Sequence, residues 1–138
     1  MVQEISFTGD SLNYCICFID IVDSTRNTFI LDAEKMKRYY SVFINIMAAI
    51  ARDFNSVIIK NTGDSLIYYF PETSDSTNMS AFTHVLKCGL TMIAVHPMIN
   101  TKLNEEGLPS LDYRISADYG RTDIAQSLTT TSEDFAQK

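Results

Sequence analysis

The segment from Tyr14 to Val22 constrains the fold more than any other part of the sequence, because it is apolar and β-prone along almost its whole length. Continuous runs of this kind are typical of a central strand that is covered on both faces. One charged residue, Asp20, interrupts the run. An unpaired carboxylate inside such a strand would cost several kcal/mol, so Asp20 needs a cationic partner. The run stops at three residue types that favour turns and helix N-termini, Asp23, Ser24 and Thr25.

Two amphipathic helices are predicted from the spacing of apolar residues. Such residues recur at steps of three and four from about Asp32 to Phe54, with charged residues between them. A second helix is expected from about Asn78 to His96. Pro97 cannot supply a backbone N–H donor within a helix, so we expect a kink or a break there.

A β-hairpin is predicted between the two helices. Its strands are Ser56–Lys60 and Ser65–Phe70, and Asn61–Asp64 forms the tight turn. Residues 71–76 are expected to be a polar loop. The hairpin would therefore carry Asp64 at its tip.

The C-terminal part is expected to add two strands, Leu111–Asp118 and Arg121–Ser127, with a turn between them. The order β-α-β-β-α-β-β indicates an α+β fold, a ferredoxin-like α/β sandwich with a mostly antiparallel sheet. We expect one domain over residues 1–138, with a leader segment at 1–12 and a flexible tail at 129–138.

Composition limits the classes of partner. The formal net charge is −6 and the pI is about 4.7, which argues against nucleic acid or an anionic membrane as a general partner. A phosphate ligand stays compatible with this charge, because a metal or a local group of cations can reverse the field in one cleft.

Cellular location is inferred from the cysteines and from the apolar segments. Cys15, Cys17 and Cys88 form no CxxC pattern and are interpreted as buried, reduced thiols. The N-terminus lacks the charged stretch followed by an apolar one that a secretory signal peptide has, and no apolar run suits a membrane span. We therefore expect a cytoplasmic domain without direct membrane contact.

Asp20 and Asp64 are the candidate metal ligands. If the first strand and the hairpin are neighbours in one sheet, the two carboxylates converge at one edge, where Mg²⁺ would find the oxygen ligands it prefers. The alternative is that Asp20 pairs with a lysine or arginine and Asp64 serves only the turn. Next to Asp20, backbone N–H groups of residues 22–25 and the Thr25 hydroxyl could bind an anion, although this segment could also be a plain helix cap.

Three segments resemble the catalytic domains of class III adenylate and guanylate cyclases. Phe18–Thr25 is similar to the family's F-x-D-I-x-x-[FS]-T signature, Lys60–Asp64 to its K-x-x-G-D hairpin, and Arg114–Gly120 to its R-[IV]-x-x-x-x-G segment. The three occur in the family's order and span most of the chain. Three motifs in order are far more specific than one.

The resemblance implies a role for each matching residue. Asp20, Asp64 and the Ile21 carbonyl would hold two Mg²⁺ or Mn²⁺ ions, which activate the ribose 3′-hydroxyl and bind the triphosphate. The groups implied to hold the nucleotide are Ile21, Val22, Asp23, Ser24, Thr25, Lys60 and Arg114. Lys60 would read the purine from the opposite subunit and favour ATP over GTP, and Arg114 would neutralise phosphate charge. Otherwise Lys60 is a solvated edge charge and Arg114 a surface arginine.

The chain departs from the family pattern at its end. The family carries an asparagine and an arginine that stabilise the transition state, and residues 129–138 supply no N-x-x-x-R pattern. We expect an adenylate cyclase or the metal- and ATP-binding part of one. Losing groups that stabilise the transition state costs about a hundredfold or more in rate, so the chain as it stands is expected to turn over slowly or not at all. The alternative is a catalytically silent nucleotide-binding or dimerisation sensor. An exposed sheet edge favours a homodimer, with domain swapping as one route to it.

Two other phosphate-handling folds do not fit. A haloacid-dehalogenase-like phosphatase needs D-x-D, whereas Asp20 and Asp23 are separated by two residues and would not share a strand face. A receiver domain needs alternating parallel β/α units, which the hairpin at Asn61–Asp64 interrupts.

Overall fold

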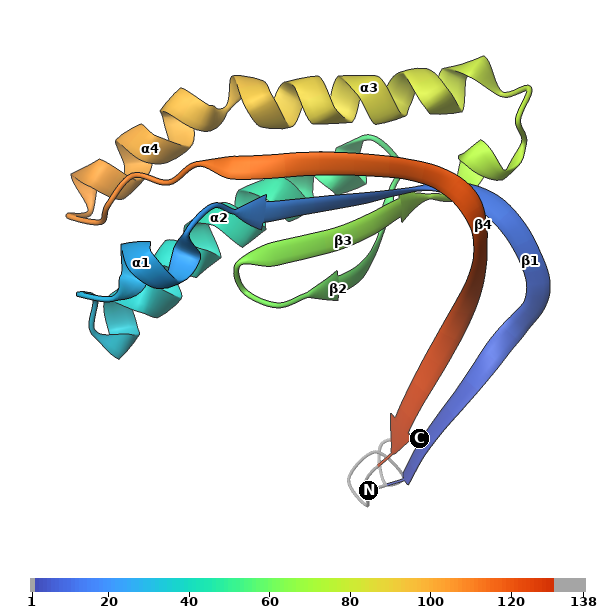
Figure 1. Cartoon of the computed structure of the whole chain (residues 1–138), viewed down its shortest axis with the longest axis horizontal. Helices are drawn as coiled ribbons and strands as arrows, with labels where there is room; N and C mark the ends of the chain where they lie inside the picture. Colours follow the sequence, from blue (N-terminus) through green and yellow to red (C-terminus); the bar gives the residue numbers. More distant parts are fainter. Residues whose placement is uncertain (1, 131–138) are drawn as a thin grey trace.

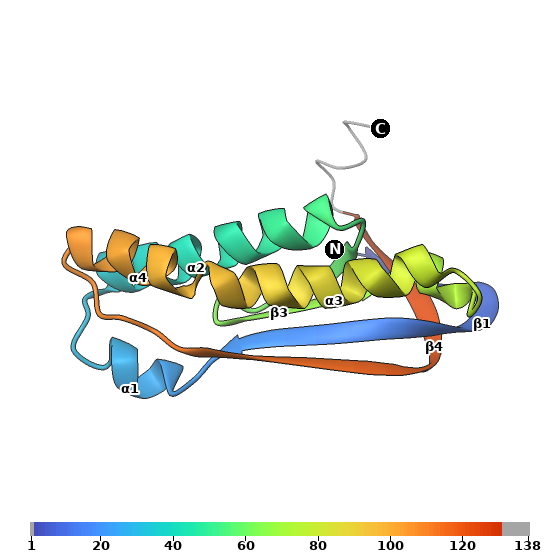
Figure 2. The ribbon, with the colours of Figure 1, turned by 90° about the horizontal axis from the view of Figure 1, so that it is seen from above.

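The chain folds as one antiparallel sheet with its longer helices on one face (Figures 1 and 2). A computed structural model describes the backbone of residues 2–130 and the side chains of residues 12–26 and 28–122. The strands are β1 (Val2–Ile21), β2 (Val57–Asn61), β3 (Ser65–Phe70) and β4 (Tyr113–Thr130), in the spatial order β2-β3-β1-β4. Every strand pair is antiparallel. This confirms the α+β sandwich expected from the sequence.

The central strand β1 is covered by helices on one face only. Its residues alternate, with Cys15, Cys17, Ile19 and Ile21 buried in the core, whereas Phe18 between them is 43% exposed. The prediction of a strand covered on both faces is therefore wrong for the described residues. A continuous apolar run does not reveal which of its two faces receives a helix. We call the other side, which carries Phe18 and Asp20, the open face of the sheet.

The first long helix, α2 (Ala33–Asp53), agrees with its prediction. Asp32 caps its N-terminus, where the side chain accepts a hydrogen bond from the Lys35 backbone N–H at 2.8 Å. Its buried stripe, centred on Tyr39, Phe43 and Met47, packs on the sheet. The predicted hairpin is also confirmed, as β2 and β3.

The second helical region has the predicted break but is longer than predicted. α3 (Met79–Ala94) ends just before His96, and α4 (His96–Glu105) begins with Pro97 in its first turn, where no backbone donor is needed. Taken together, Met79–Glu105 is long and apolar enough to cross a membrane by length and composition alone, which the sequence reading did not anticipate. This is a weak indicator, because core helices pass the same test. Cys88 and Met92 contribute to the hydrophobic core, but only 17% of the apolar window is buried in the described part of the chain.

Two short elements replace predicted turns and loops. α1 (Ser24–Thr28) follows β1 directly, and a 3₁₀ helix, η1 (Pro71–Ser74), occupies the expected polar loop. Thr73 in η1 is fully buried, and its hydroxyl accepts a hydrogen bond from the Cys15 N–H at 2.9 Å and donates to the Phe70 carbonyl. This loop is therefore part of the core.

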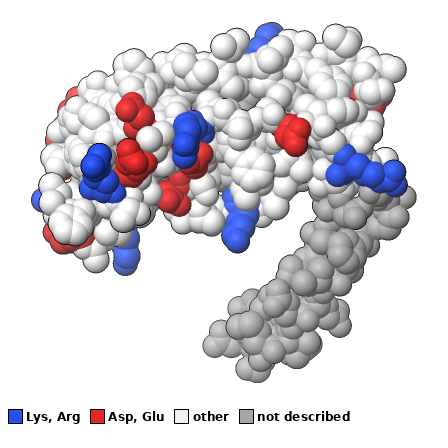
Figure 3. Space-filling view, viewed as in Figure 1, with Lys and Arg blue, Asp and Glu red and all other residues white. Residues whose placement is uncertain are grey.

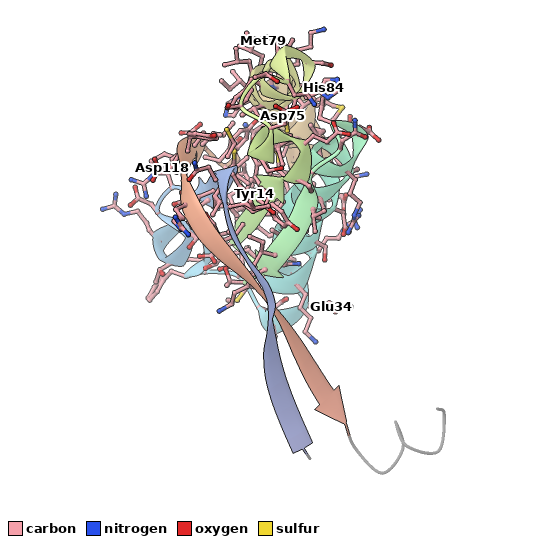
Figure 4. The ribbon with its side chains drawn as sticks, turned by 90° about the vertical axis from the view of Figure 1, so that its right-hand side faces the viewer. Tyr14, Glu34, Asp75, Met79, His84 and Asp118 are labelled. Atoms are coloured by element: carbon pink, nitrogen blue, oxygen red, sulfur yellow. The ribbon has the colours of Figure 1, made fainter. Side chains whose placement is uncertain are left out.

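The C-terminal strands differ most from the prediction. The two expected strands form a single strand, β4, with Gly120 paired to Tyr14 in the middle of the ladder instead of in a turn. β4 stays extended because β1 also runs on toward the N-terminus, through most of the expected leader, with a bulge between Phe7 and Ser11. Both strands bend together beyond the helices into a two-stranded arm (Figures 1 and 4). Most of the predicted tail, residues 131–138, lies outside the described residues.

All three cysteines are buried and free, as predicted. Burial raises the pKa of Cys17 to about 12 and that of Cys88 to about 11. Both thiols therefore stay protonated at neutral pH.

Candidate functional site

The end of β1 and the tip of the β2–β3 hairpin are joined directly. The Ile21 backbone N–H donates to the Asp64 carbonyl at 2.9 Å, and Asp20 lies opposite Ser65 in the β1–β3 register. The fold thus brings two residues 44 positions apart in the sequence (from 20 to 64) to the same end of neighbouring strands. This is the arrangement that the metal-site hypothesis requires of the backbone. The roles of the individual residues stay predictions.

Asp64 is half-buried, and hydroxyl groups hold both of its carboxylate oxygens. Ser24 donates to Oδ2 at 2.8 Å, and Thr62 donates to Oδ1 at 3.1 Å. Ser24 belongs to α1 and Thr62 to the turn of the hairpin. The carboxylate therefore does more than close a turn, because it connects the hairpin tip to the helix that follows β1.

Asp20 lies on the open face and is not deeply buried. Its Oδ2 accepts a hydrogen bond from Arg114 Nη2 at 3.0 Å, and Arg114 is its direct neighbour in the β1–β4 register. The side chains are 38% and 72% exposed, respectively. The expectation that Asp20 is buried within an apolar strand is corrected here. Its pairing with an arginine, the alternative considered from the sequence, is present.

An open hollow of about 670 Å³ lies beside α1. Its lining residues are Ile21, Asp23, Ser24, Thr25, Arg26 and Phe29. Asp23 adopts a left-handed conformation, with φ 53°, which turns the chain sharply from β1 into α1. The hollow therefore lies beside the turn from β1 into α1, next to the end of β1 that carries Asp20.

One predicted nucleotide-binding residue needs correction. The Val22 N–H was expected to be available for an anion, but it donates to the Asp112 carbonyl at 2.9 Å, just before β4. Conversely, sequence reasoning missed Arg26, which is exposed and lines the hollow. Arg26 directly follows Thr25, and this position at the predicted helix start could have identified it as a candidate phosphate-binding residue. On this face, charged side chains of both signs gather toward the end where α1 lies (Figure 3).

The remaining candidate, Lys60, lies on the edge strand β2, four residues before Asp64. It is exposed and pairs in register with Ile67 of β3. A bulge between Ile58 and Lys60 changes the local direction of the strand. Among the described residues, no side chain forms an ion pair with Lys60, which suits either of the two roles considered from the sequence.

The available donors fit a hard divalent cation. Asp20, Asp64 and the Ile21 carbonyl all offer oxygen, the donor that Mg²⁺ and Mn²⁺ prefer. Among the described residues, no group of three or more His, Cys, Asp or Glu side chains could hold a metal ion without further ligands. A cation at this position would have to take its other ligands from water or phosphate. Mg²⁺ commonly binds in that way.

Comparison with solved structures settles the fold. The guanylyl cyclase Cya2 matches over 93% of this chain and 68% of its own, with a TM-score of 0.76 and 16% identity. The adenylyl cyclase CyaB from P. aeruginosa matches over 99% and 71%, with a TM-score of 0.74 and 16% identity. The chain has the fold of a nucleotide cyclase domain.

A third cyclase domain has the same fold. The dimeric guanylyl cyclase domain of the RhoGC fusion protein from the aquatic fungus Blastocladiella emersonii matches over 88% of this chain and 63% of its own, with a TM-score of 0.67 and 16% identity. No protein-family model matches the sequence, and no curated protein matches it. At this level of identity, the cyclase fold is shared, while the substrate and the activity have to be argued from the site.

Proposed function

We propose that this chain is the metal- and nucleotide-binding part of a nucleotide cyclase that converts ATP into 3′,5′-cyclic AMP and pyrophosphate. The observation that carries the proposal is the junction of β1 with the hairpin tip, where the Ile21 N–H donates to the Asp64 carbonyl and Ile21 also lines the α1 hollow. Asp20 directly precedes Ile21 on β1, and Asp64 lies at the hairpin tip, so both candidate carboxylates belong to residues of this junction. The adenylyl and guanylyl cyclases with the same fold support this reading.

In the proposed reaction, the ribose 3′-oxygen attacks the α-phosphorus and pyrophosphate leaves. Two bound Mg²⁺ or Mn²⁺ ions would lower the pKa of the 3′-hydroxyl and neutralise the triphosphate. Asp20 and Asp64 would hold these ions with the Ile21 carbonyl. Asp23, Ser24 and Thr25 border the hollow that would receive the phosphates.

The two arginines of the site would provide positive charge for the phosphates. Arg26 lines the hollow, and Arg114 reaches Asp20 from β4. A guanidinium binds phosphate through two parallel N–H groups, which fixes orientation as well as charge. Lys60 would read the base of a nucleotide held by the opposite subunit.

A homodimer is part of the proposal. Leu12 and Phe18 project from the open face of β1, and both remain more than two-fifths exposed, at 42% and 43%. A second copy would cover them and bring its Lys60 toward the nucleotide, whether by simple packing or by domain swapping. Solved structures of the RhoGC domain with this fold describe it both as a dimer and as a monomer.

Calorimetry with a non-hydrolysable ATP analogue and Mn²⁺ tests the proposal. Asp20→Ala and Asp64→Ala are expected to weaken binding by about tenfold or more, because each removes a cation ligand. Asp118→Ala is the matched control, since this exposed carboxylate lies opposite Ile16 in the same β1–β4 ladder. Unchanged affinity in both site variants would remove the metal assignment.

The second candidate is a sensor that binds the nucleotide without turning it over. An assay for cyclic AMP separates the two functions. Tight nucleotide binding with no product would favour the sensor.

A further inference from the structure

Ser24 connects Asp64, a candidate metal ligand, with the hollow that is proposed to receive the phosphates. Its hydroxyl donates to Asp64 Oδ2 at 2.8 Å, across 40 residues of sequence, and its side chain also lines the hollow. The Ser24 carbonyl accepts a hydrogen bond from the Thr28 hydroxyl at 2.8 Å, which anchors the residue within α1. Ser24 is thus held on both sides.

A serine hydroxyl has a single proton to donate. In this structure that proton is directed to Asp64, so Ser24 cannot donate to a phosphate at the same time. In this arrangement the Ser24 hydroxyl serves the carboxylate, and a nucleotide-binding role for it stays a prediction. A phosphate could still use other groups around the hollow, such as Thr25.

The hairpin turn supplies the complementary restraint on Asp64. Thr62 donates to the other carboxylate oxygen, and the Asn61 side chain holds the Gly63 N–H at 2.7 Å. Gly63 has φ 93°, a conformation that favours glycine. Each carboxylate oxygen can accept more than one interaction, so both remain able to bind a cation. The two hydroxyls together determine the orientation of the carboxylate plane.

We propose that Ser24 is a positioning residue that orients Asp64 for cation binding and so couples α1 to the metal site. The inference rests on the proposed function, since it assumes that Asp64 binds a divalent cation. Groups that orient a ligand in this way commonly change metal affinity by 10–100-fold when they are removed. The proposal predicts a loss of Mn²⁺ affinity that is separate from any loss of folding stability.

The test measures Mn²⁺ binding to the full chain by electron paramagnetic resonance of free Mn²⁺, alongside thermal unfolding. Ser24→Ala is expected to weaken Mn²⁺ binding about tenfold, and Ser24→Thr, which keeps the hydroxyl, is expected to restore it. Ser41→Ala is the matched control, because the Ser41 hydroxyl donates to the Lys37 carbonyl within α2. A role limited to stability would lower the melting temperature and leave the Mn²⁺ affinity of the folded protein unchanged.

Two further variants keep the outcome decisive. If Ser24→Ala does not fold, Ser24→Cys keeps the size but weakens the donor, and wild-type Mn²⁺ affinity in that variant would overturn the proposal. Asp64→Ala separates the two hypotheses. If it lowers Mn²⁺ affinity while Ser24→Ala does not, the positioning role alone is wrong. If neither does, the metal assignment to Asp64 is wrong as well.

Discussion

Arg114 donates to Asp20 across the β1–β4 ladder, with Nη2 3.0 Å from Oδ2. The two residues face each other in register on the open face of the sheet. A divalent cation bound by Asp20 would compete with the guanidinium for the same carboxylate. Arg114 would then be available to a phosphate, so one side chain could serve two partners in turn.

This competition predicts opposite effects of Arg114→Ala on two ligands. Mn²⁺ alone should bind about two- to fivefold more tightly, the range given by losing an exposed ion pair of up to ~1 kcal/mol. The ATP analogue with Mn²⁺ should bind more weakly, because a phosphate contact is lost. Calorimetry measures both. Arg52→Ala, an exposed arginine of α2, is the control, and parallel changes in the two affinities would contradict the exchange.

The base preference depends on Lys60 in the proposed function. Lys60→Glu is expected to lower the affinity ratio of ATP to GTP, because a carboxylate accepts hydrogen bonds from guanine where the ammonium donates to adenine. Competition between the two nucleotides for Mn²⁺-loaded protein measures the ratio. Lys37→Glu, an exposed lysine of α2, makes the same charge change away from the site. An equal effect of both variants would show that net charge, and not Lys60, is responsible.

Thr73 is expected to be a stability determinant. Thr73→Val removes the acceptor for the Cys15 N–H and the donor to the Phe70 carbonyl while preserving shape. Leaving these buried groups unsatisfied should lower the free energy of unfolding by about 1–3 kcal/mol. Urea denaturation measures the change. Thr83→Val, at an exposed position on α3, should change stability by less than about 0.5 kcal/mol, and a similar loss in both would contradict this account.

The buried thiols predict a loss of stability at alkaline pH. Burial raises the pKa of Cys17 from its ordinary value of 9.0 to about 12, and that of Cys88 to about 11. The folded state therefore binds these protons more tightly than the unfolded state. The stability they contribute is fully present below pH 9 and is lost as the pH rises through the folded values. Chemical denaturation across this range measures the loss.

The thiols also allow a matched control for that prediction. Cys17→Ser/Cys88→Ser should show a weaker decline in the alkaline range, because serine does not titrate there. Equal slopes for the variant and the wild type would contradict the assignment. At neutral pH, thiol reagents should react slowly with the folded protein, since little thiolate is present.

Local sequence patterns determined much of the fold. The spacing of apolar residues was sufficient for α2 and for the β2–β3 hairpin, because period and turn chemistry act over a few neighbouring residues. Pro97 was sufficient for the break between α3 and α4. The motifs around Asp20 and Asp64 also indicated that the end of β1 and the tip of the hairpin lie side by side.

Tertiary contacts decided the rest. Which face of β1 receives helices, and that β4 continues past Gly120, depend on strands and helices far away in the sequence. Asp20 pairs with Arg114 because β1 and β4 are neighbours in the sheet. Asp64 pairs with Ser24 because the tip of the β2–β3 hairpin meets α1. A local pattern carries the preference of a segment, whereas the partner of a side chain is decided by the chain that packs against it. For that reason the candidate residues were predictable from the sequence, and their hydrogen-bond partners were not.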